Sequence, residues 1–174
     1  MNKKRILLPV FSALMAALIT VTNLIIHIPL PAGLGYINIG DIFVIISAVT
    51  LGPVYGALAG GTGGALSDLF LGYSVYIPAT AVIKALTALI AGLMYKNNKK
   101  KTVAVYALCS AAGEIVNPVL YFIYEFLILG YGKAAAANLP FNIIQAAAAV
   151  AGACALYTVL KRAKLSERIS KYGG

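Results

Sequence analysis

Basic residues in this chain gather at the ends of long apolar runs, and this pattern constrains the fold more than any other feature. Twelve of the fourteen Lys and Arg residues fall in three places, at residues 3–5, 96–101 and 161–171. Only 11% of the residues are charged, against about 25% in soluble domains. Hydrophobic residues make up 61%, and the mean hydropathy is +0.89. The chain is therefore predicted to be an integral membrane protein rather than an unusually apolar soluble one.

The net charge of +9 does not indicate nucleic-acid binding. The basic clusters flank apolar runs, as the positive-inside rule predicts for the cytoplasmic ends of membrane helices. Their expected counter-charge is the anionic headgroup of the lipid. Cys109 and Cys154 lie in apolar segments without CxxC or metal-ligand spacing, so neither a disulfide framework nor a zinc site is expected.

The predicted fold is an all-α integral membrane protein with six transmembrane helices in a single domain, residues 1–174. The N-terminal run resembles a signal peptide, but it lacks a small-x-small cleavage site, so we expect it to be retained as the first helix. Alternation across the membrane then places both termini and the basic loop at 96–101 in the cytoplasm. The predicted helices cover approximately residues 6–28, 40–51, 54–71, 79–95, 102–129 and 138–160.

A polar stripe interrupts the fifth predicted helix. Its members recur at helical spacing and therefore share one face; they are Glu114, Asn117, Tyr121 and Glu125. An acid inside a membrane helix is costly, so it is expected to face a partner or a water-filled cavity. Pro118 removes one backbone hydrogen bond and is predicted to kink the helix beside the stripe.

Other costly polar residues fall at the same level of the predicted membrane domain. The outer halves of separate helices carry Asp41, Asp68, Lys84, Asn142 and Gln145. The outer loops add Tyr36, Asn38 and Tyr76. We therefore predict one site, open to the outside, to which these residues and the polar stripe all contribute.

Several of these residues have a plainer alternative role. Asp41 opens the second predicted helix, and Asp is a good N-terminal capping residue. Asp68 and Lys84 lie at similar depth on neighbouring helices, which favours an ion pair between them, with or without a place at the border of the site. The tyrosines of the second outer loop, Tyr73 and Tyr76, are either part of an interfacial belt or walls of the site.

Small residues mark two helix faces for close packing. Ser12 and Ala16 are spaced four apart in the first predicted helix, and so are Ala13 and Ala17. This patch either packs within the protein or docks a separate membrane subunit. Glycines at positions 56, 60 and 64 form a second stripe that permits a tight helix crossing. The stripe is not a phosphate loop, because it lies inside an apolar run and no Lys-Ser/Thr pair follows it.

The available functional groups favour binding over catalysis. Amides, carboxylates, one lysine and several tyrosines suit a flat, polar heteroaromatic molecule, which the rings stack on and the polar groups hydrogen-bond. The sequence contains no Ser/His/Asp constellation, and its one histidine lies far from the acids. The protein is therefore predicted not to be an enzyme, and no cofactor or metal is expected. No nucleotide-binding motif is present, so the chain is not expected to hydrolyse ATP by itself.

Six short runs carry a resemblance to a known family. They are GYINIGD at 35–41, LGPVYGA at 51–57, GALSD at 64–68, TAVIK at 80–84, Glu114 with Tyr121-Phe122, and NIIQ at 142–145. In combination they resemble the substrate-binding S components of energy-coupling factor (ECF) transporters, over nearly the whole chain. The similarity is greatest to the riboflavin-type subgroup, which also includes pyridoxine and hydroxymethylpyrimidine binders.

The resemblance implies a six-helix protein that binds a vitamin or a vitamin precursor from outside and delivers it by toppling in the membrane. Its implied partners are a transmembrane T component and two ATPase subunits, in the plasma membrane of a prokaryote. Ala13 and Ala17 correspond to the small pair that docks the T component, and residues 30–38 to a lid. The stretch Asn117-Pro118-Val119-Leu120 replaces the Met and Gly that often precede Tyr-Phe in the family. Pyridoxine or hydroxymethylpyrimidine is the expected ligand, with riboflavin as the alternative.

Two other functions stay open at this point. One is a self-sufficient secondary transporter of a small polar solute, with Glu114 as its proton-coupling group. The other is a non-transporting membrane scaffold that uses only the alanine and glycine faces.

Overall fold

The computed structural model describes residues 3–30 and 35–162. The basic tail beyond Arg162 and residues 31–34 of the predicted lid lie outside the described residues. In chain order the elements are α1 (Lys3–Ile25), β1 (His27–Pro29), β2 (Tyr36–Asn38), α2 (Asp41–Thr50), α3 (Pro53–Leu71), the 3₁₀-helix η2 (Ser74–Tyr76), α4 (Ile77–Asn97), α5 (Val103–Glu114), α6 (Val116–Ile123), the π-helix η3 (Tyr124–Ile128) and α7 (Lys133–Arg162).

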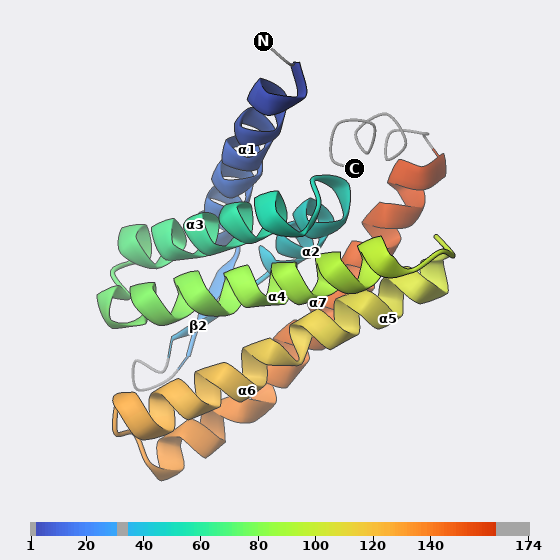
Figure 1. Ribbon diagram of the computed structural model, residues 1–174. Helices are drawn as coiled ribbons and strands as arrows, with labels where there is room; N and C mark the ends of the chain where they lie inside the picture. The colour runs from blue at the N-terminus through green and yellow to red at the C-terminus, as the bar shows by residue number, and fades with distance from the viewer. Residues whose placement is uncertain (1–2, 31–34, 163–174) are drawn as a thin grey trace.

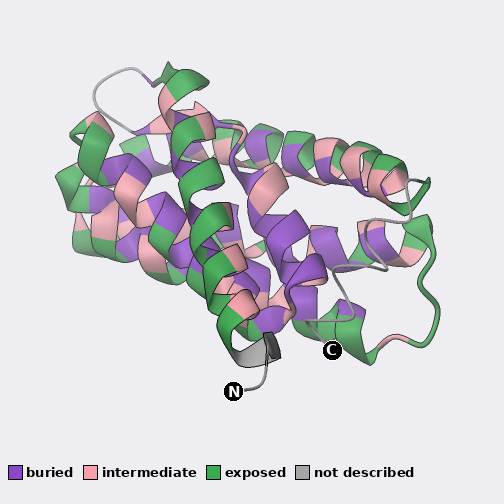
Figure 2. Ribbon diagram, turned by 90° about the horizontal axis from the view of Figure 1, so that it is seen from above, coloured by how far each residue is buried: buried purple, intermediate pink, exposed green. Residues whose placement is uncertain are grey.

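Four helical segments of the described chain are long and apolar enough to cross a membrane. They are Ile6–Ile25, Ser74–Asn97, Val103–Ile128 and Lys133–Arg162. Helix α2 has 10 residues, which span about 15 Å, half of the hydrocarbon core of a bilayer. Large apolar side chains such as Leu14 and Leu127 are 59% and 70% exposed, and buried positions face the interior of the bundle (Figure 2). The prediction of a helical membrane protein is therefore confirmed, whereas the number of membrane passes stays a prediction.

Each of the six predicted helices has a counterpart, but the fifth is divided into three pieces. Helix α5 ends at Glu114, and a turn at Ile115 separates it from α6. In a continuous helix the carbonyl of Glu114 would accept a hydrogen bond from residue 118, and Pro118 has no N–H to donate. The π-helix η3 then follows α6 directly. The last helix also begins earlier than predicted, at Lys133 instead of residue 138.

The segment between α1 and α2 forms a short β-hairpin, which the sequence did not predict. Strands β1 and β2 are antiparallel, with His27 opposite Asn38 and Pro29 opposite Tyr36. Beyond the strands, the N–H of Leu30 donates to the carbonyl of Gly35 at 2.9 Å. Because side chains alternate along a strand, Tyr36 and Asn38 lie on the same face of the hairpin.

Helix α3 packs closely on its neighbours because its glycines leave no side chain in the way. A Cβ placed on Gly56 would lie 2.4 Å from the Cα of Ala48 in α2. One on Gly60 would lie 3.0 Å from the carbonyl oxygen of Lys84 in α4, and one on Gly63 would lie 2.8 Å from the carbonyl oxygen of Ala16 in α1. The tight crossing predicted for the glycine stripe is therefore present, and α3 contacts three helices.

The two ends of the bundle differ in chemistry. In Figure 1 the hairpin, the α3–α4 turn and the α6–α7 turn lie toward one end, and the α2–α3 turn, the α4–α5 connection and the end of α7 lie toward the other. At the second end Tyr106 stacks on Tyr157 with ring centroids 4.1 Å apart. The Tyr95 and Tyr157 hydroxyls lie 2.6 Å apart. The Nζ of Lys161 donates to the carbonyl of Lys101 at 2.7 Å, which joins two of the basic clusters at this end.

Replacing Gly56 with Ala is expected to destabilise the fold. The substitution gains up to about 1 kcal/mol of helix propensity, but the new methyl group collides with backbone atoms of Ala48, which do not move freely. Overpacking of this kind costs about 1–3 kcal/mol. Thermal unfolding in detergent, followed by circular dichroism, measures the change. Ala104→Val adds methyl groups at an exposed helix position and serves as the control; equal melting temperatures for the two variants would contradict the packing argument.

Candidate functional site

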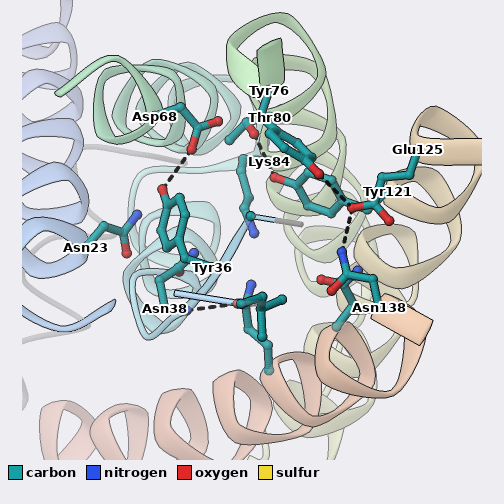
Figure 3. Close-up of a pocket in the computed structure, with 14 residues that line it drawn as sticks. Asn23, Tyr36, Asn38, Asp68, Tyr76, Thr80, Lys84, Tyr121, Glu125 and Asn138 are labelled. Atoms are coloured by element: carbon teal, nitrogen blue, oxygen red, sulfur yellow. Dashed lines mark hydrogen bonds between the residues drawn. The ribbon is translucent and has the colours of Figure 1, made fainter. Parts of the chain in front are cut away.

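A polar cavity lies at the hairpin end of the bundle, where the β-hairpin meets α1, α3, η2, α4, α6, η3 and α7 (Figure 3). Its free volume is about 30 Å³. It is lined by Asn23, Leu30, Gly35, Tyr36, Asn38, Asp68, Tyr76, Thr80, Lys84, Tyr121, Glu125, Asn138, Asn142 and Gln145. Almost all of these side chains are polar, whereas the lipid-facing surface of the same helices is apolar.

The floor of the cavity is held by an ion pair between Lys84 of α4 and Asp41 of α2. The Nζ of Lys84 lies 2.7 Å from both carboxylate oxygens of Asp41. Both residues are almost fully buried, with 2% and 1% of their surface exposed. An isolated charge at this depth would be very costly, so each residue depends on the other.

Three further polar side chains complete this network. Asn117 of α6 accepts a hydrogen bond from Lys84 at 3.2 Å, and its amide nitrogen donates to a carboxylate oxygen of Glu114. The Nε2 of Gln145 in α7 donates to Asp41 at 2.7 Å. The ion pair therefore links α2 and α4 to α6 and α7, which lie far apart in the sequence.

The hairpin forms one wall of the cavity and is attached to the helices by specific hydrogen bonds. The backbone N–H of Asn38 donates to Oε1 of Gln145 at 2.9 Å. The Tyr36 hydroxyl donates to Oδ1 of Asp68 at 2.8 Å. Burial and the neighbouring Asp68 carboxylate raise the pKa of the Tyr36 hydroxyl, which therefore stays protonated as the donor. Asn23 of α1 supports the base of this wall by accepting from the N–H of Gly40 at 2.9 Å.

The opposite wall is built around Glu125 of the π-helix. Its Oε1 accepts from the Tyr76 hydroxyl at 3.2 Å and from Nδ2 of Asn138 at 2.6 Å. On the same side the Thr80 and Tyr121 hydroxyls lie 2.8 Å apart. π-helical turns occur frequently at functional sites. In this one Glu125 is buried, while the residues that follow it, Phe126, Leu127 and Ile128, are exposed on the outer surface.

Nine of the twelve predicted site residues line the cavity: Tyr36, Asn38, Asp68, Tyr76, Lys84, Tyr121, Glu125, Asn142 and Gln145. The other three, Asp41, Glu114 and Asn117, are buried beside the lining residues in the network around Lys84. Of the two tyrosines in the second outer loop, Tyr76 lines the cavity and Tyr73 does not.

Two of the plainer roles considered for these residues are wrong. Lys84 pairs with Asp41 and not with Asp68, because α2 brings its first residue directly opposite the ammonium group, while Asp68 bonds to Tyr36. Asp41 does not cap α2: Gly40 occupies the capping position without a side-chain hydrogen bond, and the Asp41 carboxylate points toward Lys84, Asn117 and Gln145.

Five lining residues were not among the predicted site residues, although Leu30 and Gly35 belong to the segment expected as the lid; the five are Asn23, Leu30, Gly35, Thr80 and Asn138. Asn23 and Asn138 carry a signal in the sequence, since each is an amide at the outer end of an apolar helix. Thr80 gives no such signal, because a threonine inside a membrane helix can bond to its own backbone. Leu30 and Gly35 line the cavity only because the hairpin folds over it.

The small residues of α1 separate into two faces. Ser12 and Ala16 are buried, and the Ser12 hydroxyl donates to the carbonyl of Tyr55 in α3 at 2.8 Å. Ala13 and Ala17 are exposed on the other side of the helix. The Ser12/Ala16 pair therefore packs within the protein, and the Ala13/Ala17 pair lies on the outer surface.

The site has the chemistry of a binding pocket. Its walls offer carboxylates, amides and phenol hydroxyls, and the described residues contain no group of three His, Cys, Asp or Glu side chains that would hold a metal ion. Tyrosine rings flank the polar groups, with the centroids of Tyr76 and Tyr121 6.4 Å apart. Such a pocket is suited to a planar, polar ligand.

Comparison with known proteins gives the family. The family model described as ECF-type riboflavin transporter, S component, matches residues 3–162. The chain is also similar to a protein of Pyrococcus woesei described as an uncharacterized protein in gap 3'region, with 34% identity over 144 residues that cover 83% of this chain and 95% of that protein. The matched family consists of transporter components and is not an enzyme family. Since this match covers nearly the whole chain, the chain belongs to the family of S components of ECF-type riboflavin transporters.

Proposed function

We propose that this protein is a high-affinity substrate-binding subunit that captures a small heteroaromatic vitamin or vitamin precursor from outside the cell. It hands the ligand over for ATP-driven uptake, together with a transmembrane T component and two ATPase subunits. One observation carries the proposal: polar side chains from the hairpin and seven helical segments converge on one cavity inside an otherwise apolar bundle. Burying that many polar groups in a membrane domain is costly unless they serve a ligand or an ion path.

The proposed topology has six membrane passes with both termini in the cytoplasm of a prokaryotic cell. The basic residues near Lys101 and Lys161 lie at the end of the bundle opposite to the cavity, as the positive-inside rule requires for a site that faces outward. Helix α2 has 10 residues and is too short to cross a bilayer alone. Family membership favours this function over a self-sufficient transporter coupled to protons through Glu114.

A single ring, pyridoxine or hydroxymethylpyrimidine, is proposed over riboflavin because a smaller molecule requires less movement of the cavity walls. The free volume of the cavity, about 30 Å³, is far below the roughly 300–1,000 Å³ of typical ligand pockets, so the walls must move apart to admit any ligand. The hairpin is the part that moves in this proposal, because Leu30 and residues 35–38 cover the cavity and are held there by few hydrogen bonds. It then acts as the lid.

The purified full-length protein is expected to bind one ligand from a panel of riboflavin, pyridoxine, hydroxymethylpyrimidine and thiamine. Isothermal titration calorimetry in detergent measures the affinity. Gln145→Ala removes the amide that joins the lid to the floor and should weaken binding about tenfold. Asn97→Ala removes an exposed amide far from the cavity and serves as the control. A panel without a single binder would overturn the proposed function.

The buried ion pair is expected to support both stability and binding. Lys84→Met leaves Asp41 charged and unpaired, which should lower the free energy of unfolding by about 3–5 kcal/mol and abolish binding. Adding Asp41→Asn removes the stranded charge and should restore part of the stability. Lys133→Met, at an exposed lysine, is the control. If the single and double variants melt at the same temperature in detergent, the Lys84–Asp41 ion pair does not stabilise the fold as proposed.

The exposed Ala13/Ala17 pair is proposed to dock the T component. Ala13→Leu with Ala17→Leu should block assembly with co-expressed T and ATPase subunits, measured by co-purification, and leave ligand binding unchanged. Ala104→Leu changes an exposed alanine of α5 in the same way and is the control. Loss of ligand binding in parallel with loss of assembly would instead show that the pair is part of the internal packing.

A further inference from the structure

Carboxylates outnumber cations around the cavity. Four of the five Asp and Glu residues of the chain surround it, and each has no more than 2% of its surface exposed; they are Asp41, Asp68, Glu114 and Glu125. Lys84 is the one buried lysine or arginine among the described residues. Acid residues this deep in a membrane domain need a positive or hydrogen-bond-donating partner.

The ammonium group of Lys84 is already fully engaged within the protein. A lysine has three N–H donors, and those of Lys84 face the two oxygens of Asp41, each at 2.7 Å, and Oδ1 of Asn117 at 3.2 Å. Lys84 therefore neutralises Asp41, and its ammonium group is engaged by protein groups rather than left free for a negatively charged ligand.

The two carboxylates that line the cavity are only half satisfied. Asp68 uses Oδ1 for the Tyr36 hydroxyl, and Glu125 uses Oε1 for Tyr76 and Asn138. The second oxygen of each, Oδ2 of Asp68 and Oε2 of Glu125, is buried and has no hydrogen-bond partner among the described residues. Figure 3 shows the two carboxylates on opposite sides of Lys84. Leaving a buried charged acceptor without a donor is expensive, so these oxygens point to a group that arrives with the ligand.

We propose that the ligand of this site is a cationic heteroaromatic molecule, a single ring that carries a protonated amine or amidine-type group. The proposal rests on the function proposed above and narrows its substrate class. The cation would donate to Asp68 or Glu125 and lie near the faces of Tyr36, Tyr76 and Tyr121, where aromatic rings also attract positive charge. An anionic ligand would meet two carboxylates with no free cation to offset them.

The test compares three molecules with the same ring and different charge. Pyridoxamine carries an aminomethyl cation where pyridoxine has a neutral hydroxymethyl group and pyridoxic acid a carboxylate. Titration into the full-length protein in detergent should give the tightest binding for pyridoxamine, by about tenfold over pyridoxine, and the weakest for pyridoxic acid. The hydroxymethyl-aminopyrimidine and its pyrimidinone counterpart repeat the comparison on a second ring, and the amino compound should bind more tightly.

Substitutions then assign the preference to the two carboxylates. Glu125→Gln and Asp68→Asn keep the shape and one acceptor but remove the charge, and each should reduce the ratio of pyridoxamine to pyridoxine affinity about tenfold. Glu167→Gln removes the same charge from the basic tail and should leave the ratio unchanged. The ratio is informative even where a variant folds less stably, because both ligands are measured on the same protein.

The outcomes separate this inference from the function on which it rests. Binding of pyridoxine, the pyrimidinone or riboflavin with equal or greater affinity than the amino compounds would overturn the cationic ligand and leave the proposed function in place. An unchanged ratio in both Glu125→Gln and Asp68→Asn would do the same. No binding of any of these molecules would overturn the proposed function, and this inference with it.

Discussion

The buried ion pair between Lys84 and Asp41 is the interaction on which the rest of the structure depends. Neither charge is tolerable alone in the interior of a membrane domain, so the first residue of α2 must lie beside the middle of α4. Asn117 and Gln145 bond to the same pair and bring α6 and α7 to it. Gln145 also accepts a hydrogen bond from the backbone of the hairpin, so the position of the hairpin depends on that of the ion pair.

Close helix packing makes this arrangement possible. The glycine stripe of α3 lies directly against Lys84: a Cβ on Gly60 would be 3.0 Å from the lysine carbonyl oxygen, and one on Gly64 would be 3.0 Å from its Cγ. The small residues therefore do more than let two helices cross. They allow α4 to approach α3 so closely that the lysine stem is enclosed and its ammonium group is directed to Asp41.

The two ends of the bundle carry different kinds of side chain. One end is closed by stacked tyrosines and by lysines that bond to backbone carbonyls. The other end holds two half-satisfied carboxylates in a small cavity beneath the β-hairpin.

The sequence by itself determined the class of the protein and most of the polar residues around the cavity. Apolar runs with basic ends require membrane helices, and an acid or amide inside such a run must face inward, so Glu125 and Gln145 were recognisable without a structure. Only the tertiary structure decided who pairs with whom. Their similar depth in the membrane made Asp68 the expected partner of Lys84. In the structure the orientation of α2 places Asp41 beside Lys84 instead, and the hairpin places the Tyr36 hydroxyl beside Asp68. Spacing along a helix reports which face a residue occupies, whereas the partner across a gap depends on the angle and approach of separate helices, which no local pattern in the chain encodes.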